Sequence, residues 1–307
     1  MNIHFKLDEL LDFLIEKKLY HPDIIDKTAK ETVIKGFSSI FHSKPFTLSW
    51  MKDQSFDWST IQSSVVICAR NAVLPENTGI IFIPVENPRD TFAIVMNKFY
   101  PQNSLLGISE TAVIGENCEL GNNIYIGHHV VIGNNVKIGD NTQIHHNATI
   151  HDSTSIGSNC IIHSGVVIGE DGFGYHNDTD GSIFKLPHIA RVIIEDYVEV
   201  GTNSCIVKGK LIDTVIKSNV KIGNLSHISH DVIIDENAMI THLTHIGGNT
   251  KINSHSWIAP GVVLKQGVSI GENALVGMGA VVIRDVNPNE TAAGVPAKPI
   301  TRKSPNA

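Results

Sequence analysis

The sequence of 307 residues is poor in aromatic and charged side chains, which make up 6% and 18% of the chain. Its net charge of -7 at pH 7 is mildly acidic, and no stretch is rich in lysine and arginine. Nucleic-acid binding needs a basic surface that neutralises phosphates, so we expect no nucleic acid among the partners. Few aromatics beside many Ile, Val and Gly residues favour a repetitive β architecture over a helical one.

Long hydrophobic runs are also missing. No apolar segment approaches the roughly 20 residues that cross a bilayer, so we expect no membrane span. Residues 1–18 carry charges throughout and lack the apolar centre of a signal peptide. Cys68, Cys118, Cys160 and Cys205 form no Cys-x-x-Cys pair and no short disulfide framework. This pattern predicts reduced thiols and a cytoplasmic protein. We also expect no bound metal and no permanently bound cofactor.

An internal six-residue repeat dominates the rest of the sequence. An aliphatic residue recurs at every sixth position from Ile108 to Ile168, from Ile194 to Ile206 and from Ile216 to Val282. A period of six fits neither an α-helix nor one long amphipathic strand, but it fits short strands with a corner at each repeat. Three repeats then make one triangular coil, so that residues three repeats apart stack on each other. The sequence therefore predicts a mainly β fold, a left-handed parallel β-helix over residues 104–290.

Two breaks interrupt this register. The step from Ile168 to Ile194 is eight residues longer than three repeats, and we expect residues 169–191 to leave the coil as an extended loop. The step from Ile206 to Ile216 predicts a small bulge around Lys208–Lys210.

Residues 1–103 lack the repeat and predict a small α/β domain. Four leucines between Leu7 and Leu14 follow the spacing of an amphipathic helix. Residues 63–69 and 79–85 have the composition of strands, and 88–100 predict a helix with Pro88 in its first turn. We place the junction with the coil at residues 101–103 and treat 291–307 as a C-terminal tail.

This order of segments resembles one family of hexapeptide-repeat acyltransferases, the UDP-3-O-(3-hydroxyacyl)glucosamine N-acyltransferases (LpxD). The resemblance covers nearly the whole chain, and residues 171–175 (DGFGY), 185–187 (KLP) and 191–194 (RVII) match the family's extended loop. It implies substrate binding by Phe173 and Tyr175 in that loop. It also implies a homotrimer, whose flat-faced prisms place the sites between subunits.

Residues 48–56 resemble the stretch with which that family holds uridine between two aromatic side chains. The corresponding residues are Trp50, Asp53 and Phe56. An aromatic face stacks on a pyrimidine while a polar side chain reads its edge. The family has Asn where this chain has Asp53, and a carboxylate only accepts hydrogen bonds, so UDP and dTDP sugars both stay open. Alternatively, Trp50 and Phe56 fill the core of the small domain.

The segment Ile228–Asp231 (ISHD) resembles the family's catalytic segment and makes His230 the candidate general base. Imidazole has the right pKa to take a proton from an attacking amine near neutrality, and Asp231 would orient the ring. Gly248 follows His230 by three repeats, so the coil predicts that it stacks directly above. Its backbone N–H would stabilise the oxyanion of the thioester carbonyl. The alternative is a surface imidazole in a polar ladder.

The end of the sequence instead resembles CoA-dependent sugar acetyltransferases. Residues 292–300 (AAGVPAKPI) carry this likeness, and nothing after them could form the helices with which LpxD engages acyl carrier protein. We therefore expect acyl-CoA as the co-substrate of an N-acyltransferase that acts on a nucleotide-linked amino sugar. The alternative is an LpxD-type enzyme of lipid A synthesis that depends on acyl carrier protein.

Two other classes are weighed against the acyltransferase. The related γ-class carbonic anhydrases bind zinc on such a coil, and His145, His146, His151 and His163 cluster here. However, His145 and His163 lie three repeats apart, as do His227 and His245, so these pairs are expected to be stacked ladders. The last class is a non-catalytic β-helix scaffold, in which His230 has no chemical role.

Overall fold

The computed structural model describes residues 3–20, 31–52, 57–76, 78–100 and 105–300. The chain divides into two compact units, Met1–Ser104 and Leu105–Ala307. The junction predicted at residues 101–103 lies outside the described residues. None of the helices in the described ranges is long and apolar enough to cross a membrane.

The first unit is built on a four-stranded parallel sheet in the order β3-β4-β5-β6. Its strands are β3 (Gly36–Phe37), β4 (Thr47–Trp50), β5 (Val65–Ala69) and β6 (Ile81–Val85). Its other elements are the antiparallel pair β1 (Phe5–Lys6) and β2 (Val33–Ile34), the helices α1 (Leu7–Glu16) and α2 (Pro88–Phe99), and the 3-10 turns Ile40–His42 and Trp58–Thr60. The predicted helices and strands are confirmed to within two residues.

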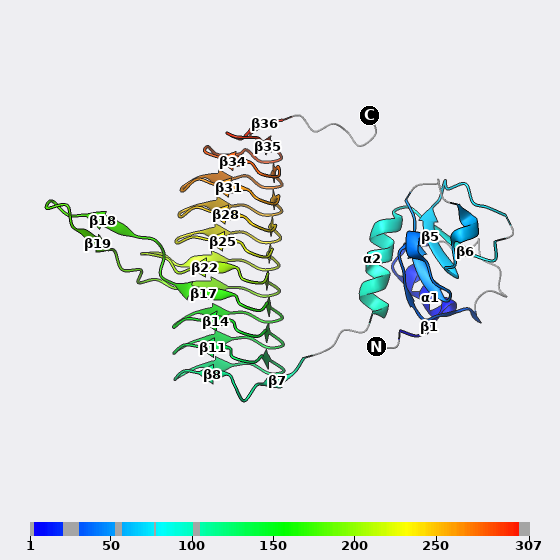
Figure 1. The fold of residues 1–307 in the computed structure, drawn as a ribbon, viewed down its shortest axis with the longest axis horizontal. Helices are drawn as coiled ribbons and strands as arrows, with labels where there is room; N and C mark the ends of the chain where they lie inside the picture. Colours follow the sequence, from blue (N-terminus) through cyan, green and yellow to red (C-terminus); the bar gives the residue numbers. More distant parts are fainter. Residues whose placement is uncertain (1–2, 21–30, 53–56, 77, 101–104, 301–307) are drawn as a thin grey trace. The chain divides into compact units, whose positions relative to one another are not determined.

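Local sequence explains both helices of this unit (Figure 1). The four leucines of α1 are buried because they share one face of the helix. At the start of α2, the Asn87 side chain accepts a hydrogen bond from the Asp90 backbone N–H, and Pro88 occupies the first turn. Proline is favoured there because its missing N–H is not needed for a helical hydrogen bond.

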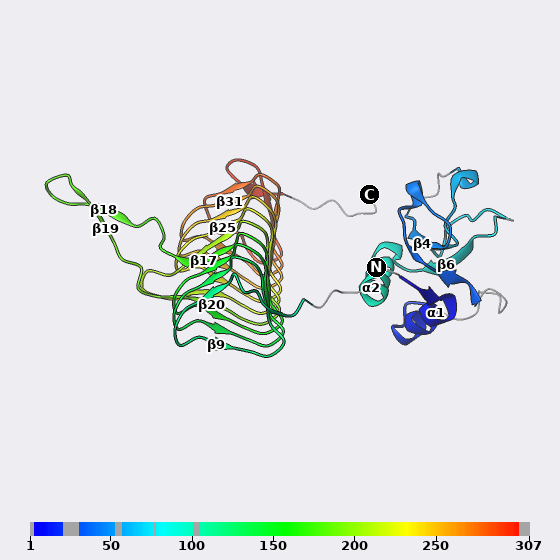
Figure 2. The same cartoon turned by 60° about the horizontal axis from the view of Figure 1, so that its bottom comes forward.

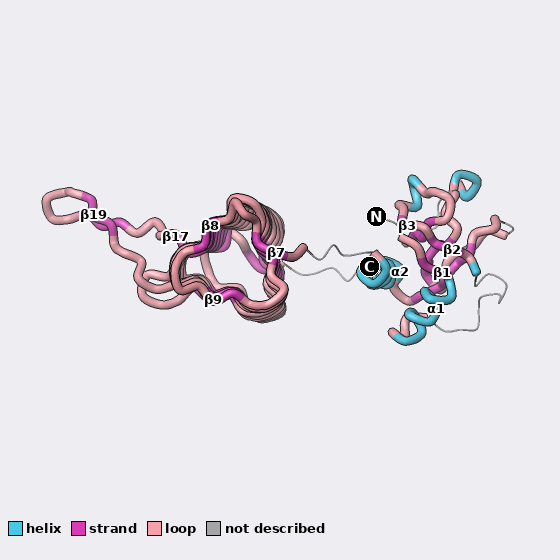
Figure 3. Tube along the Cα trace, turned by 90° about the horizontal axis from the view of Figure 1, so that it is seen from below, coloured by secondary structure: helices cyan, strands magenta, loops and turns pink. Residues whose placement is uncertain are grey.

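The second unit is the predicted left-handed parallel β-helix, with three faces that Figure 3 shows along the coil. In the described ranges its sheets have eleven, nine and eight strands. The eleven-stranded sheet contains β7 (Gly107–Ile108), β10 (Tyr125–Ile126), β13 (Gln143–Ile144), β16 (Ile161–Ile162), β21 (Glu199–Val200), β24 (Lys221–Ile222), β27 (Met239–Ile240), β30 (Trp257–Ile258), β33 (Leu275–Val276), β35 (Thr291–Ala293) and β36 (Lys298–Pro299). The nine-stranded sheet contains β8 (Val113–Ile114), β11 (Val131–Ile132), β14 (Thr149–Ile150), β17 (Val167–Glu170), β22 (Cys205–Val207), β25 (His227–Ile228), β28 (His245–Ile246), β31 (Val263–Leu264) and β34 (Val281–Val282). The eight-stranded sheet contains β9 (Glu119–Leu120), β12 (Lys137–Ile138), β15 (Ser155–Ile156), β20 (Val192–Ile194), β23 (Thr214–Ile216), β26 (Ile233–Ile234), β29 (Lys251–Ile252) and β32 (Ser269–Ile270).

The repeated aliphatic residues form the core of the coil. From Ile126 onward they are almost completely buried, and each stacks on its equivalent in the next coil. A corner residue with positive φ turns the chain between most strands, and asparagine occupies this position most often, for example Asn141 at φ 58°. Asparagine tolerates the left-handed conformation better than most residues, which explains its recurrence at the corners.

The excursion of residues 169–191 is larger and more regular than the sequence analysis predicts. It forms an antiparallel hairpin of β18 (Tyr175–Asn177) and β19 (Ile183–Lys185), which extends away from the coil in Figures 1 and 2. Ile194 pairs directly with Ile156 of the coil below. In an uninterrupted coil, that place belongs to the residue one repeat after Ile168. The excursion is therefore an insertion within a single six-residue step, and the expectation that it adds eight residues to three repeats was wrong. The chain leaves one face of the coil and returns at the start of the next face.

The coil also continues past its predicted end at residue 290. Thr291–Ala293 pairs in parallel with β33 as a further rung, and Lys298–Pro299 folds back against it as an antiparallel strand. Residues that the sequence analysis assigned to a separate tail therefore complete the stack.

Candidate active site

A cavity of about 340 Å³ lies on the nine-stranded sheet of the coil, beside β22, β25, β28 and β31. Its lining combines the histidines and glycines of this face with the beginning of the excursion. The lining residues are Gly172, Phe173, Val207, His227, Ser229, His230, His245, Gly247, Gly248, Val263, Leu264, Lys265 and Gln266. The structure thus brings His230 and Gly248 to one cavity.

His230 and Asp231 form a buried hydrogen-bonded pair on the corner after β25. The Nδ1 atom of His230 lies 2.8 Å from Oδ2 of Asp231, and the two side chains are 8% and 7% exposed. Oδ1 of Asp231 accepts a hydrogen bond of 2.8 Å from the Lys210 backbone N–H. Burial would raise the pKa of Asp231, but the hydrogen bonds from His230 and Lys210 outweigh it and lower the pKa. An ionised Asp231 fixes the imidazole with its Nε2 atom available for a substrate proton.

Gly248 packs against the His230 ring, as the spacing of three repeats predicts. A Cβ atom at Gly248 would come within 2.3 Å of Cε1 and 2.6 Å of Nε2 of that ring. The neighbouring Gly247 N–H is bonded to the Leu264 carbonyl, whereas within the described residues the Gly248 N–H donates to no protein acceptor. A backbone N–H without a protein acceptor can donate to an oxyanion, and its place beside the candidate base puts both groups within reach of one reacting carbonyl.

The excursion contributes Phe173 to this cavity, with the ring 88% exposed. Tyr175 contacts Phe173, with ring centroids 5.0 Å apart, but it does not line the cavity. Asp171 forms ion pairs with Lys185 and with Lys208, the latter at 2.9 Å. Hydrogen bonds from these two ammonium groups lower the pKa of Asp171 to about 2. These ion pairs hold the base of the excursion over the cavity.

Two further histidines line the cavity, and the sequence analysis treated them as a ladder. The rings of His227 and His245 are stacked at 5.2 Å and 3°. His145 and His163 are stacked in the same way at 5.4 Å, so the ladder prediction is confirmed for both pairs. Burial, and the neighbouring His245, lower the pKa of His227. In the described part of the chain, no three His, Cys, Asp or Glu side chains are grouped to hold a metal ion.

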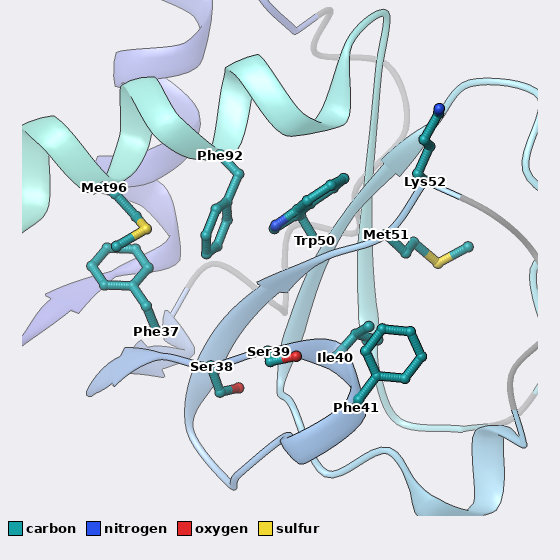
Figure 4. Close-up of a pocket in the computed structure, with 10 residues that line it drawn as sticks. All are labelled: Phe37, Ser38, Ser39, Ile40, Phe41, Trp50, Met51, Lys52, Phe92 and Met96. Carbon is teal, nitrogen blue, oxygen red and sulfur yellow. The ribbon is translucent and has the colours of Figure 1, made fainter. Parts of the chain in front are cut away.

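Trp50 lines a second cavity, of about 630 Å³, within the first unit (Figure 4). Its half-buried indole lies between the aromatic ring of Phe92 on α2 and the Met51–Lys52 segment that follows β4, and its centroid is 6.4 Å from that of Phe92. Apolar side chains dominate the lining, and among the described residues Lys52 is its one charged side chain. The other two residues of the predicted nucleotide stretch, Asp53 and Phe56, lie outside the described residues.

His188 is the buried residue at the coil site that the sequence analysis missed. It contacts the His230 ring, with centroids 5.5 Å apart at 64°, although it comes much earlier in the chain. No periodicity could reveal this contact, because His188 belongs to the excursion and not to the repeat.

Comparison with known proteins supports both the fold and the resemblance drawn from the sequence. The profile of the family described as Bacterial transferase hexapeptide (six repeats) matches residues 111–139, 135–170 and 249–284. The chain is 36% identical over 218 residues to a UDP-3-O-acylglucosamine N-acyltransferase of Coxiella burnetii, which covers 65% of this chain and 64% of the relative. It is 41% identical over 140 residues to the protein of that name from Rhizobium meliloti, covering 46% of the chain and 40% of the relative.

Among solved structures, the UDP-N-acetylglucosamine acyltransferase LpxA of Bacteroides fragilis is similar with a TM-score of 0.58 and 26% identity. The match covers 63% of this chain and 74% of that structure. The match to the Coxiella relatives spans less than two thirds of their own length.

Proposed function

We propose that this chain is an N-acyltransferase that moves an acyl group from a thioester to the amine of a UDP-linked amino sugar. The observation that carries the proposal is the buried arrangement of Asp231, His230 and Gly248 at the edge of a cavity. It offers an oriented base and an unused backbone donor side by side, which are the two groups that acyl transfer requires. The names of the relatives supply the class of acceptor.

In this mechanism, the acceptor nitrogen attacks the thioester carbonyl carbon. His230 Nε2 removes one proton from the attacking nitrogen, while the Gly248 N–H stabilises the negative charge on the carbonyl oxygen. The C–S bond then breaks, and the imidazolium returns the proton to the thiolate. The products are an amide and a free thiol, so atoms and charges balance without a metal or a redox partner.

The cavity of the first unit supports a nucleotide end for the acceptor. Its volume suits a nucleoside, Trp50 supplies an aromatic face, and Lys52 supplies a positive charge for a phosphate. We expect Trp50→Ala to raise KM for the UDP sugar about tenfold or more, with kcat nearly unchanged, because stacking contributes ~1–3 kcal/mol per base.

The matched control for this substitution is Trp257→Ala, which removes an indole that lines neither cavity. Initial rates over a range of UDP-sugar concentrations give both constants. An unchanged KM in Trp50→Ala, or an equal rise in the control, contradicts a stacking role for Trp50.

The name of the relatives, UDP-3-O-acylglucosamine N-acyltransferase, favours the LpxD-type alternative, whose expected acyl donor is acyl carrier protein, over the acyl-CoA prediction. The acetyltransferase-like segment that pointed to CoA completes the last rung of the coil, so its composition has a structural reason. We expect higher kcat/KM with an acyl chain on acyl carrier protein than with the same chain on CoA. Parallel assays with UDP-3-O-acylglucosamine as acceptor measure this ratio, and a preference for acyl-CoA contradicts the donor assignment.

We further propose that the protein is a homotrimer, in which a neighbouring coil completes the cavity on the flat nine-stranded face.

We also propose that the reaction takes place in the cytoplasm. All four cysteines are free thiols in the structure, so no disulfide requires an oxidising compartment.

A further inference from the structure

His188 lies at the end of the excursion, where the chain returns to the coil. Its side chain is 4% exposed. The two residues after it are anchored to the bulge between β22 and β23, because the Ile189 and Ala190 N–H groups donate to the Lys210 and Gly209 carbonyls at 3.0 and 3.2 Å. Lys210 in turn caps Asp231 through its own N–H. The bulge therefore fixes both His188 and the carboxylate partner of His230.

The backbone of residues 171–175 (DGFGY) packs closely against the His188 ring. A Cβ atom at Gly172 would lie 2.8 Å from Nε2 of His188, and one at Gly174 would lie 2.9 Å from Cε1. Real Cβ atoms do not approach so closely, so any side chain at either glycine must displace the ring. The two glycines thus allow the backbone to pack directly against the His188 ring, which also contacts His230.

Three groups together define the orientation of the His230 ring. Asp231 holds its Nδ1 atom, Gly248 packs against the ring closely enough to exclude a Cβ atom, and the His188 ring meets it at 64° with centroids 5.5 Å apart. A ring restrained by a hydrogen bond, by a backbone contact and by a second ring has little freedom to rotate. The first two restraints belong to the coil, whereas the third comes from the excursion.

The nitrogens of His188 are buried without partners. Neither Nδ1 nor Nε2 meets hydrogen-bonding geometry with a partner among the described residues, although the Leu186 backbone is close enough to raise the pKa of the ring. A buried polar group without a partner destabilises a fold, so an apolar residue of similar size would pack here at lower cost. Residues that reduce stability in this way are often kept for function.

We propose that His188 is a positioning residue for the candidate base, one whose ring packs against the His230 ring and holds it in the orientation needed for proton transfer. The inference rests on the proposed function, because it gives His188 a role in proton transfer. His188 touches neither substrate nor thioester in this scheme, and it acts only through His230.

The charges around His188 are consistent with a neutral ring in this role. Burial lowers the pKa of His188, and the nearby Asp171 raises it while His230 and Lys210 lower it further. A neutral His188 ring avoids the repulsion that two charged rings in contact would experience when His230 takes a proton.

The test replaces His188 by residues that lack ring nitrogens, His188→Phe and the smaller His188→Leu. We expect kcat to fall about tenfold in both variants, with KM for the acceptor nearly unchanged, because the His230 ring loses a contact that fixes its orientation. Initial rates over a range of acceptor concentrations separate the two constants. Histidine labelled with carbon-13 also allows the mobility of the His230 ring to be followed by NMR, with His230→Ala used to assign its signal, and we expect this mobility to rise.

Stability separates this role from a structural one. We expect His188→Phe to unfold at a temperature equal to or above that of the original protein, because a buried polar group is replaced by an apolar ring of similar size. A fall in unfolding temperature with an unchanged His230 ring signal would overturn the proposal, as would an unchanged signal with kcat within twofold. The control is His176→Phe, which replaces an exposed histidine of the same excursion. The NMR measurement needs no substrate, so the inference is tested even if no acyl transfer is found.

Discussion

Replacement of His230 by alanine is expected to lower kcat for acyl transfer by about 10³-fold, because it removes the group that takes the amine proton. The buried hydrogen bond of 2.8 Å with Asp231 is lost in the same substitution. For this reason a second variant, His230→Asn, is needed. Its amide can donate to Asp231 in place of Nδ1, but it cannot accept a proton. We expect a comparable loss of kcat with little loss of stability.

The matched control is His128→Ala, which removes an exposed histidine on an earlier rung of the coil. Rates of amide formation from the UDP amino sugar and the acyl thioester provide the measurement, and circular dichroism reports whether the fold persists. A folded His230→Asn protein with full activity would remove His230 from the mechanism, and only a lack of turnover in the unmodified protein as well would favour the non-catalytic scaffold.

Gly248→Ala is expected to lower kcat by about 10²-fold or more while the protein stays folded. The new Cβ atom would lie 2.3–2.8 Å from three atoms of the His230 ring, so the ring must move. Asp231 and His188 pin that ring from other sides, and any movement displaces Nε2 from the acceptor. The methyl group also crowds the N–H that we assign to the oxyanion, and the loss of one such donor costs ~10²–10³ in kcat.

Gly277→Ala provides the control for this prediction. It adds the same methyl group to the same type of coil, where the nearest atom is the Ala293 Cβ at 3.0 Å. Both variants are assayed at saturating acceptor and donor, so that the comparison concerns kcat alone. Near-normal kcat in folded Gly248→Ala, or an equal loss in Gly277→Ala, contradicts the assignment.

The repeat made much of this structure predictable. Because an aliphatic residue recurs every six positions and three repeats close a coil, sequence separation converts directly into spatial contact. That arithmetic places Gly248 on His230 and stacks His227 on His245, and both contacts are present. Few folds allow a glycine and a histidine so far apart in the chain to be assigned to one site without a structure.

The parts outside the repeat were predicted less well, for a physical reason. The excursion obeys no period, so its hairpin, its true length and the contact of His188 with His230 depend on tertiary packing. Tyr175 was predicted to bind substrate, but its ring packs on Phe173 and does not line the cavity. The cavity beside Trp50 likewise depends on α2, which the nucleotide-like motif does not include.

The way in which the coil resumes after the excursion has a consequence for how such chains diversify. Ile194 takes its place beside Ile156 despite the inserted residues, and Ile206 beside Ile168. Since each rung contacts only the rungs above and below, a corner can accept new sequence without disturbing the stack. Whole rungs can be gained or lost three repeats at a time, while corner insertions vary freely in length. The number of coils and the length of the excursion can thus change separately during evolution, while the corner that carries His230 stays unchanged.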